Sequence, residues 1–433
     1  MKKHTPFLLI AVIAILRFTA CTNIAPTTPC PVCPCDSIPV VVTPPVDTTE
    51  HEFIVGVNTN WWQPKEQQAK MMGVRLYAPI GWLWTENGFY GQPILQAQKQ
   101  FNGLDDYLAY MKGSGVDVLL CLHQSPDYIN GHTVGNKTNE WPPVRAGANL
   151  DDPKSYGEIA SAYKAFAIRY GSKTWPAGSY KIDPSPPRWT GDGPQQYKSG
   201  LNLVKTIEVG NEVDRWWQPE QALTAEQHAI MQMVVYDSIK AYQPDMNVVM
   251  AGQTNYDLPR LKRMAAKFKS MGRPFLSQAI CVHHYASKGN LPGAHPPTWP
   301  TNSGAPFNFD PDFYTVSQVV EWAKTIGLPA WVSEYGYDTQ PGSQLYPYAL
   351  DGKTSEQLQA EWLVSTTLEY KRLGVERCYI FTLADEPNPN AGTFTSSGLL
   401  YGEATGYKEK PAMRAIADLC AALKAGKMVF SIQ

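Results

Sequence analysis

After residue 51, short runs of apolar and β-branched residues alternate with longer segments of helical period. The short runs lack strict alternation of polar and apolar positions, which is typical of strands covered on both faces of a parallel sheet. The predicted strands are Phe53–Asn58, Val74–Ala78, Asp117–Leu122, Lys205–Gly210, Asn247–Ala251, Ala279–His284, Ala330–Glu334 and Arg377–Thr382. Amphipathic helices are predicted between them, near 63–72, 103–113, 155–170, 224–242, 257–271, 312–326, 355–373 and 410–424.

Eight βα units in succession predict a (β/α)8 TIM barrel, an α/β fold that forms a single domain over residues 51–433. A doubly wound parallel sheet is the alternative architecture. Two segments are longer than simple connections. The segment 124–152 leaves the carboxyl end of a strand, so we expect a long βα-loop insertion that shapes the active face. The segment 172–203 follows a helix and is expected to cover the opposite rim.

Several residues mark the ends of the predicted helices. Thr224-Ala225-Glu226-Gln227 has the pattern of a capping box, which predicts that a helix begins there. Glycines that follow predicted helices are expected to end them in the left-handed conformation. These glycines are Gly73, Gly115, Gly327 and Gly374.

The first residues have the order of an export signal. Lys2 and Lys3 precede an apolar run that is too short to cross ~30 Å of hydrocarbon as a helix. Small residues then lead to Cys21, in a pattern that resembles a bacterial lipobox. This resemblance implies a signal peptide over residues 1–20 and lipidation of Cys21, with a plain secretory signal as the alternative. We expect an exported protein anchored by lipid to a bacterial membrane, at the outer membrane or the cell surface.

Residues 21–50 are rich in Pro, Thr and Val, which predicts a semi-rigid tether between the membrane and the domain. The pair Cys30-x-x-Cys33 has a spacing known from metal and redox sites, but no second pair follows at ligand spacing. A linker is therefore the better interpretation. The later cysteines lie in apolar stretches, where Cys usually packs as a small hydrophobic residue. These are Cys121, Cys281, Cys378 and Cys420.

The composition narrows the classes of partner. Apolar residues make up 43% of the chain, so a full core can be buried. Lys plus Arg number 37 and Asp plus Glu 39, and this balance argues against nucleic acid or an anionic membrane surface as the main partner. Aromatic residues reach 12% while charged residues are only 18%, which suits a cleft that binds neutral, ring-shaped polar molecules.

Functional groups of such a barrel project from the carboxyl ends of its strands. At or just after the predicted strands lie Asn58, Arg75, His123, Asn211, Glu212, His283, Tyr285, Glu334, Phe381, Asp385 and Glu386. The loops that follow add Trp61, Trp62, Trp82, Trp216 and Trp217, whose rings are candidates for stacking on a sugar. Glu208 is expected to form an ion pair inside the barrel. His284 points to the opposite face from His283 and is expected to be structural.

Glu212 and Glu334 end the fourth and seventh predicted strands, so they face each other across the barrel mouth. Two such carboxyls about 5–5.5 Å apart are what retaining glycoside hydrolysis requires. One carboxyl stays protonated and delivers a proton to the leaving oxygen. The other stays ionised and attacks the anomeric carbon.

The neighbours of each glutamate indicate which role it takes. An apolar wall favours the protonated form, and Glu212 is next to Trp216 and Trp217. A cation and hydroxyl donors favour the ionised form, and we expect Arg75 and Tyr285 near Glu334.

These residues resemble the pattern of glycoside hydrolase clan A, nearest to its families 5 and 39. The matching pieces are Arg75, His123, the Asn211-Glu212 pair, His283-x-Tyr285, Glu334 and the run from Gly398 to Ala412. The resemblance covers about residues 53–425 and implies a retaining glycosidase with Glu212 as acid/base and Glu334 as nucleophile. It also implies that Asn211 bonds the sugar 2-hydroxyl and that Tyr285 orients Glu334.

One position departs from the clan pattern. The clan often places a Trp on strand eight beneath the sugar at the cleavage point, and the nearest candidate here is Phe381. Asp385 and Glu386 are alternative sources of contacts to hydroxyls. We expect an extracellular oligo- or polysaccharide as the partner, a monomeric chain, and neither cofactor nor metal.

Two other functions remain open from the sequence. The first is a catalytically inactive barrel that binds glycan at the cell surface, although a pure binder has no need of both carboxylates. The second is a metal-dependent barrel enzyme. Its candidate ligands are His123, His283, Glu212 and Glu334.

Overall fold

The computed structural model describes residues 52–90, 103–130, 142–185, 196–286, 311–347, 352–390 and 392–427. They belong to one compact unit, Val46–Gln433. The predicted signal peptide, Cys21 and the tether lie outside the described residues. Within the described ranges no helix combines the length and the apolar character needed to cross a membrane.

Eight parallel strands form the central sheet, in the order β7-β6-β5-β2-β1-β10-β9-β8. They are β1 (Ile54–Thr59), β2 (Gly73–Pro79), β5 (Asp117–His123), β6 (Thr206–Val209), β7 (Asn247–Met250), β8 (Ile280–His283), β9 (Ala330–Tyr335) and β10 (Arg377–Ile380). Gln253 and Val282 form a parallel bridge between the two outer strands, so the barrel is nearly closed. The predicted (β/α)8 TIM barrel is confirmed, and the doubly wound sheet is wrong.

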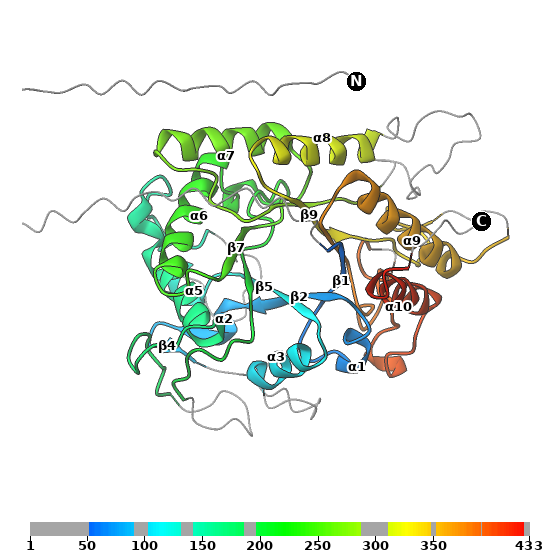
Figure 1. Cartoon of the computed structure of the whole chain (residues 1–433), viewed down its shortest axis with the longest axis horizontal. Helices are drawn as coiled ribbons and strands as arrows, with labels where there is room; N and C mark the ends of the chain where they lie inside the picture. Colours follow the sequence, from blue (N-terminus) through cyan, green and yellow to red (C-terminus); the bar gives the residue numbers. More distant parts are fainter. Residues whose placement is uncertain are drawn as a thin grey trace, which may run out of the picture. The chain divides into compact units, whose positions relative to one another are not determined.

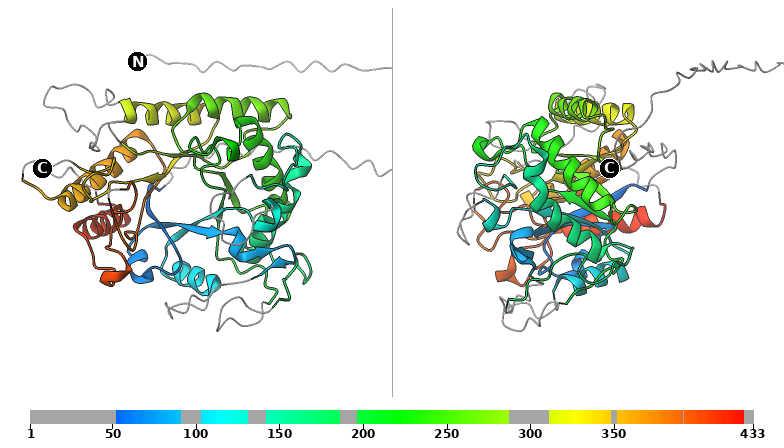
Figure 2. Two further views of the ribbon diagram at one scale, coloured as in Figure 1. Left: turned by 180° about the vertical axis from the view of Figure 1, so that it is seen from behind. Right: turned by 90° about the vertical axis from the view of Figure 1, so that its left-hand side faces the viewer.

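Helices surround this barrel, as Figures 1 and 2 show from three sides. The main ones are α3 (Leu104–Gly113), α5 (Gly157–Tyr170), α6 (Ala225–Lys240), α7 (Leu258–Ser270), α8 (Pro311–Thr325), α9 (Ser355–Leu373) and α10 (Pro411–Lys424). Short elements are α1 (Lys65–Gln68), α2 (Ile80–Leu83), α4 (Asp127–Asn130) and a hairpin of β3 (Trp84–Thr85) and β4 (Gly88–Phe89). Because helices cover the sheet outside and side chains fill it inside, the strands are buried on both faces.

The predicted helix ends are mostly right. Thr224 and Gln227 form both bonds of a capping box at the start of α6. Gly374 ends α9 in the left-handed conformation at φ 87°, where only glycine avoids strain. The prediction for Gly73 is wrong, because this residue begins β2. A side chain there would meet Ile54 and the carbonyl of Asp117, so its role is close packing between strands.

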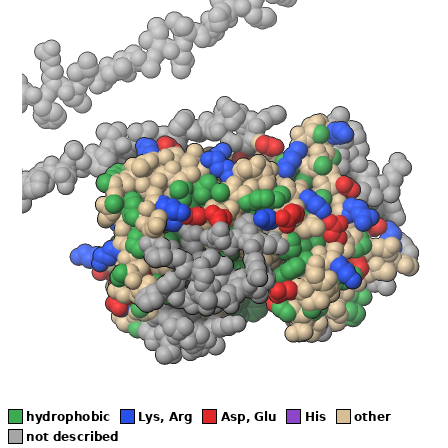
Figure 3. Space-filling view, turned by 90° about the horizontal axis from the view of Figure 1, so that it is seen from below, with side chains coloured by type: hydrophobic (Ala, Val, Ile, Leu, Met, Phe, Trp, Pro, Cys, Tyr) green, Lys and Arg blue, Asp and Glu red, His purple; other side chains and the backbone are tan. Residues whose placement is uncertain are grey.

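The segment 172–203 begins at the expected rim. Trp175 Nε1 donates to the carbonyl of Tyr242, between α6 and the start of β7. Farther on, Ile182 pairs with Phe89 of β4, so the segment also braces the connection that follows β2. On the face drawn in Figure 3, acidic and basic side chains of the described residues are interspersed with hydrophobic ones.

Candidate active site

A fully buried arginine on β2 lies at the base of the candidate site. Arg75 donates through Nε and one terminal nitrogen to both oxygens of Glu208, at 2.6 and 2.9 Å. Its other terminal nitrogen donates to Glu334 Oε1 at 2.7 Å and to Asn58 Oδ1 at 2.9 Å. Asn211 accepts from Arg75 at 2.6 Å. The ion pair predicted for Glu208 is confirmed, and one guanidinium bonds side chains from β1, β6, β9 and the loop after β6.

Glu334 on β9 is held as a carboxylate by a ring of donors. Besides Arg75, the hydroxyl of Tyr77 donates to its Oε1, and that of Tyr285 donates to its Oε2 at 2.8 Å. Burial acts to raise the pKa of Glu334, but the charges of His283 and Arg75 and the two tyrosine hydrogen bonds outweigh it. The pKa of Glu334 therefore lies below its ordinary value, and the expected nearness of Arg75 and Tyr285 is confirmed.

Glu212 follows β6 on a sharply turned backbone. Gly210 and Glu212 both have positive φ, 89° and 46°, and the latter is uncommon for a residue with a side chain. Burial raises the pKa of Glu212, and the charges of Glu334 and Asp214 raise it further, against the opposing effect of His283. Its pKa lies above the ordinary value. Trp216 and Trp217, the residues expected to form an apolar wall beside Glu212, are both exposed, and that role stays a prediction.

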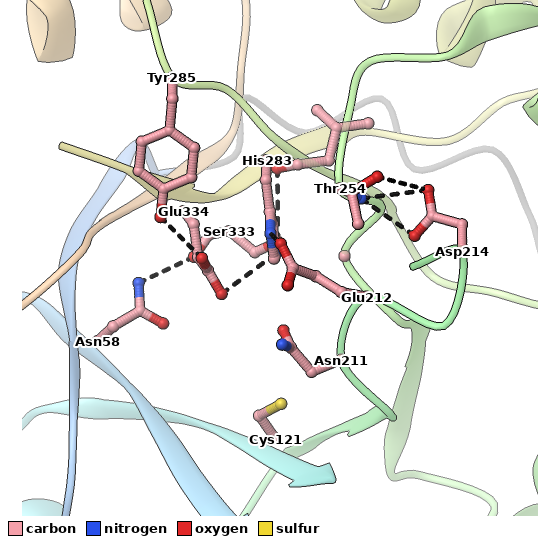
Figure 4. Close-up of polar contacts among 12 residues, drawn as sticks. Asn58, Cys121, Asn211, Glu212, Asp214, Thr254, His283, Tyr285, Ser333 and Glu334 are labelled. Atoms are coloured by element: carbon pink, nitrogen blue, oxygen red, sulfur yellow. Dashed lines mark hydrogen bonds and ion pairs between the residues drawn. The ribbon is translucent and has the colours of Figure 1, made fainter. Parts of the chain in front are cut away.

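His283 links the two glutamates (Figure 4). Its Nδ1 is 2.8 Å from Glu212 Oε1, and its Nε2 is 3.4 Å from Glu334 Oε1. Burial lowers the pKa of His283, but the two carboxylates raise it by more. One ring nitrogen of His283 and one carboxylate oxygen of each glutamate all lie within 4.8 Å of one another. The two carboxyls therefore lie close together, as predicted.

These three residues are also the group that offers ligand atoms for a metal ion among the described residues. His123, the fourth ligand suggested from the sequence, is not part of this group. Hydrogen bonds within the protein already engage His283 Nδ1 and both oxygens of Glu334. Most of these ligand atoms are thus already engaged, while His283 Nε2 is buried without a hydrogen-bond partner among the described residues.

His123 at the end of β5 is neutral. Burial lowers its pKa to about 3, helped by the charges of Arg75 and Arg215. Its Nε2 is buried and has no hydrogen-bond partner within the described part of the chain. The ring lies edge-to-face with Tyr77 at 5.2 Å, so it packs against one of the donors to Glu334.

Three tryptophans gather beside β1 and β2. Trp62 and Trp82 are stacked with ring centroids 6.0 Å apart, and Trp82 is 39% exposed. Trp61 is buried beneath them and contacts both rings edge-on. In the loop after β6, which also carries Glu212, Trp216 is 69% exposed. It lies edge-to-face with Trp217 at 5.6 Å.

The remaining predicted contacts lie in different settings. Asn58 is fully buried, with its amide bonded to the carbonyls of Ser333 and two residues of β10. Asp385 is buried in an ion pair with Lys410 at 2.7 Å. Glu386 is exposed. Their roles as substrate contacts stay predictions, but Asn58 and Asp385 have structural partners that explain their burial.

Tyr77 was not among the site residues predicted from the sequence. It lies two residues after Arg75 on the same strand, so side-chain alternation places both on the inner face of the barrel. This two-residue spacing from Arg75 was the feature of the sequence that could have identified Tyr77. Alternation did identify His284, whose Nδ1 is 2.5 Å from the hydroxyl of Tyr370 on the outer helix α9, which confirms its structural role. Cys121, Cys281, Cys378 and Cys420 are free and buried, as expected.

No protein-family model matches the chain, and no curated protein matches it. Solved structures do. A family 39 glycoside hydrolase from Bacteroides cellulosilyticus WH2 is 15% identical with a TM-score of 0.53, covering 86% of this chain and 64% of that one. Structurally, the neighbours of this chain are glycoside hydrolases. This chain spans less than two thirds of that first neighbour.

Two further neighbours share the fold. An endo-β-1,4-mannanase from Thermotoga petrophila is 14% identical with a TM-score of 0.50, covering 89% of this chain and 80% of that one. A glucosidase from Croceicoccus marinus is 12% identical with a TM-score of 0.50, covering 86% and 68%. At these identities the likeness establishes a common fold, and the chemistry has to be argued from the site.

Substituting Tyr77→Phe should lower stability in a pH-dependent way. Because the folded pKa of Glu334 is depressed, its stabilising effect is present above the unfolded value of about 4.3 and is lost as pH falls through the folded pKa. Losing one donor raises that pKa, so we expect a cost of about 1.5–3 kcal/mol at pH 7 that shrinks towards acid. Urea unfolding at several pH values measures it.

Tyr335→Phe is the matched control. Its hydroxyl is buried against Thr367 on the outside of the barrel, next to Glu334 in sequence but on the opposite face. Its cost should not change with pH. A cost for Tyr77→Phe that is equally independent of pH would contradict the proposed bond to an ionised Glu334.

Proposed function

We propose that this protein is a glycoside hydrolase that acts with retention of configuration. The observation that carries the proposal is the pair Glu212 and Glu334, whose carboxylate oxygens approach within 4.8 Å with pKa values moved in opposite directions. Inverting enzymes need their carboxyls about 6.5–9.5 Å apart to admit a water molecule. A short separation favours direct attack by one carboxylate.

In the first step, Glu334 attacks the anomeric carbon while Glu212 gives its proton to the leaving oxygen. The glycosidic C–O bond breaks as the bond from the carboxylate to the sugar forms. In the second step, Glu212 takes a proton from water, which attacks the same carbon and releases Glu334 as a carboxylate. His283 is bonded to Glu212 and lies beside Glu334. It is therefore placed to adjust its own hydrogen bonds as Glu212 loses and regains its proton.

The proposed substrate is a neutral oligo- or polysaccharide. Exposed tryptophans lie on two loops that follow barrel strands, Trp82 after β2 and Trp216 and Trp217 after β6 in the loop that also carries Glu212. Indole rings offer a large apolar face at little entropic cost, which suits the C–H faces of sugars. The amide nitrogen of Asn211, whose oxygen accepts from Arg75, and Nε2 of His123, which has no partner among the described residues, are candidates to bond sugar hydroxyls.

We also propose that the enzyme is exported and tethered by lipid on Cys21, so that it meets its polysaccharide outside the cytoplasm. In a bacterial host, the full chain should partition with membranes and incorporate labelled palmitate. Cys21→Ala should abolish the label and release the protein from membranes. Membrane association that survives this substitution would contradict the anchor.

Glu334→Ala and Glu212→Ala should each reduce turnover by at least about 1000-fold without unfolding the protein, because each removes a group that reacts. A panel of neutral polysaccharides and aryl β-glycosides, followed by reducing-sugar or aryl release, measures this. Glu403→Ala is the control, since Glu403 is an exposed glutamate in the turn before α10. It should keep full activity.

Azide then assigns the two roles. With an activated aryl glycoside, Glu334→Ala should yield a glycosyl azide of inverted configuration, since azide takes the place of the nucleophile. Glu212→Ala should yield the retained azide. If the two variants give the opposite products, the roles of Glu212 and Glu334 are exchanged. If the wild-type protein binds glycan but forms no product, the inactive binding protein is favoured.

A further inference from the structure

An exposed phenylalanine stands over the nucleophile side of the site. Phe394 belongs to the connection between β10 and α10 and is 39% exposed. Its ring centroid is 4.8 Å from that of Tyr285 and 5.6 Å from that of Phe381. It therefore contacts two aromatic rings that the sequence analysis had already placed at the site.

Both of these rings are connected to Glu334, one directly and one through Tyr77. Tyr285 donates its hydroxyl to Glu334 Oε2 at 2.8 Å. Phe381 lies edge-to-face with Tyr77 at 6.5 Å, and the hydroxyl of Tyr77 bonds Glu334 Oε1. Phe394 is thus the outermost member of an aromatic wall built around the candidate nucleophile. Its exposed fraction is the part of that wall open to solvent.

The backbone holds Phe394 in an unfavourable conformation. Its φ is 75°, which a bulky side chain rarely adopts and glycine adopts freely. The N–H of Phe394 donates to Asp338 at 2.9 Å. Asp338 is fully buried and also accepts from the hydroxyls of Ser343 and Ser397. Such strain persists only where surrounding structure enforces it, and it concentrates at functional sites.

Packing does not explain why this position carries a large ring. More than a third of the side chain is open to water, and glycine would relieve the backbone strain. Phe394 and Phe381 meet at 78°, so together they offer a larger apolar surface than either ring alone.

We propose that Phe394 is a substrate-binding residue that stacks on the C–H face of the pyranose bound against Glu334. The proposal rests on the glycosidase function argued above and extends it to a neutral pyranoside whose apolar face meets two phenyl rings. Asp338 is the positioning residue, because its bond to the Phe394 N–H fixes the ring over the site.

The test measures glycan affinity apart from turnover. The full chain carrying Glu212→Gln is run through native gels containing xylan, galactomannan, xyloglucan or mixed-linkage β-glucan, with and without Phe394→Gly. A dissociation constant follows from retardation against polysaccharide concentration. The matched control is Tyr407→Gly, because Tyr407 is a half-buried aromatic residue that also has positive φ, at 58°. The unfolding midpoint of each variant is measured in parallel.

We expect Phe394→Gly to weaken binding of the retarding polysaccharide about tenfold while its unfolding midpoint stays the same or rises. Phe394→Tyr should keep the affinity, and Tyr407→Gly should change it less than twofold. Unchanged affinity in Phe394→Gly, or a loss matched by a lower unfolding midpoint, would overturn this inference alone. A parent chain that neither binds nor cleaves any glycan would overturn the proposed function, and this inference with it.

Discussion

The site depends on how one buried guanidinium is neutralised. Arg75 has no access to water, and a buried charge is tolerated only when it is paired and fully bonded. Glu208 accepts hydrogen bonds from two of the three guanidinium nitrogens, and Glu334 accepts one from the third. Burial alone would raise the pKa of Glu334, but the charges of His283 and Arg75, with the bonds from Tyr77 and Tyr285, keep it ionised. For Glu212, burial and the charges of Glu334 and Asp214 outweigh the opposing effect of His283, so its pKa is raised and it keeps its proton more readily.

The barrel supplies this asymmetry through its topology. Parallel strands bring Arg75, Glu208 and Glu334, which are far apart in sequence, to the same inner surface, and their carboxyl ends open onto one mouth. The left-handed turn after β6 then directs Glu212 towards His283, rather than into the interior layer that holds Glu208. A single imidazole between the two carboxyls couples their protonation, so the pair behaves as a unit.

Much of this was predictable from the sequence, for identifiable reasons. Apolar runs with helical segments between them located all eight strands, because both faces of each strand are buried. The glutamate pair followed from its place at strand ends. Tyr77 was missed although strand alternation pointed to it, and Phe394 was missed because its position depends on a bond between two loops. The direction of the Trp216 and Trp217 side chains could not be predicted, because loop side chains have no period that fixes it.

The central claim is that Glu334 is an anion and Glu212 an acid in the same opening. The most direct measurement is a carbon-13 NMR titration of the glutamate side-chain carboxyls in the full chain, with Glu334→Gln and Glu212→Gln used to assign the two signals. We expect Glu334 to titrate below about 4.3 and Glu212 above it. Two ordinary values, or the reverse order, would contradict the claim.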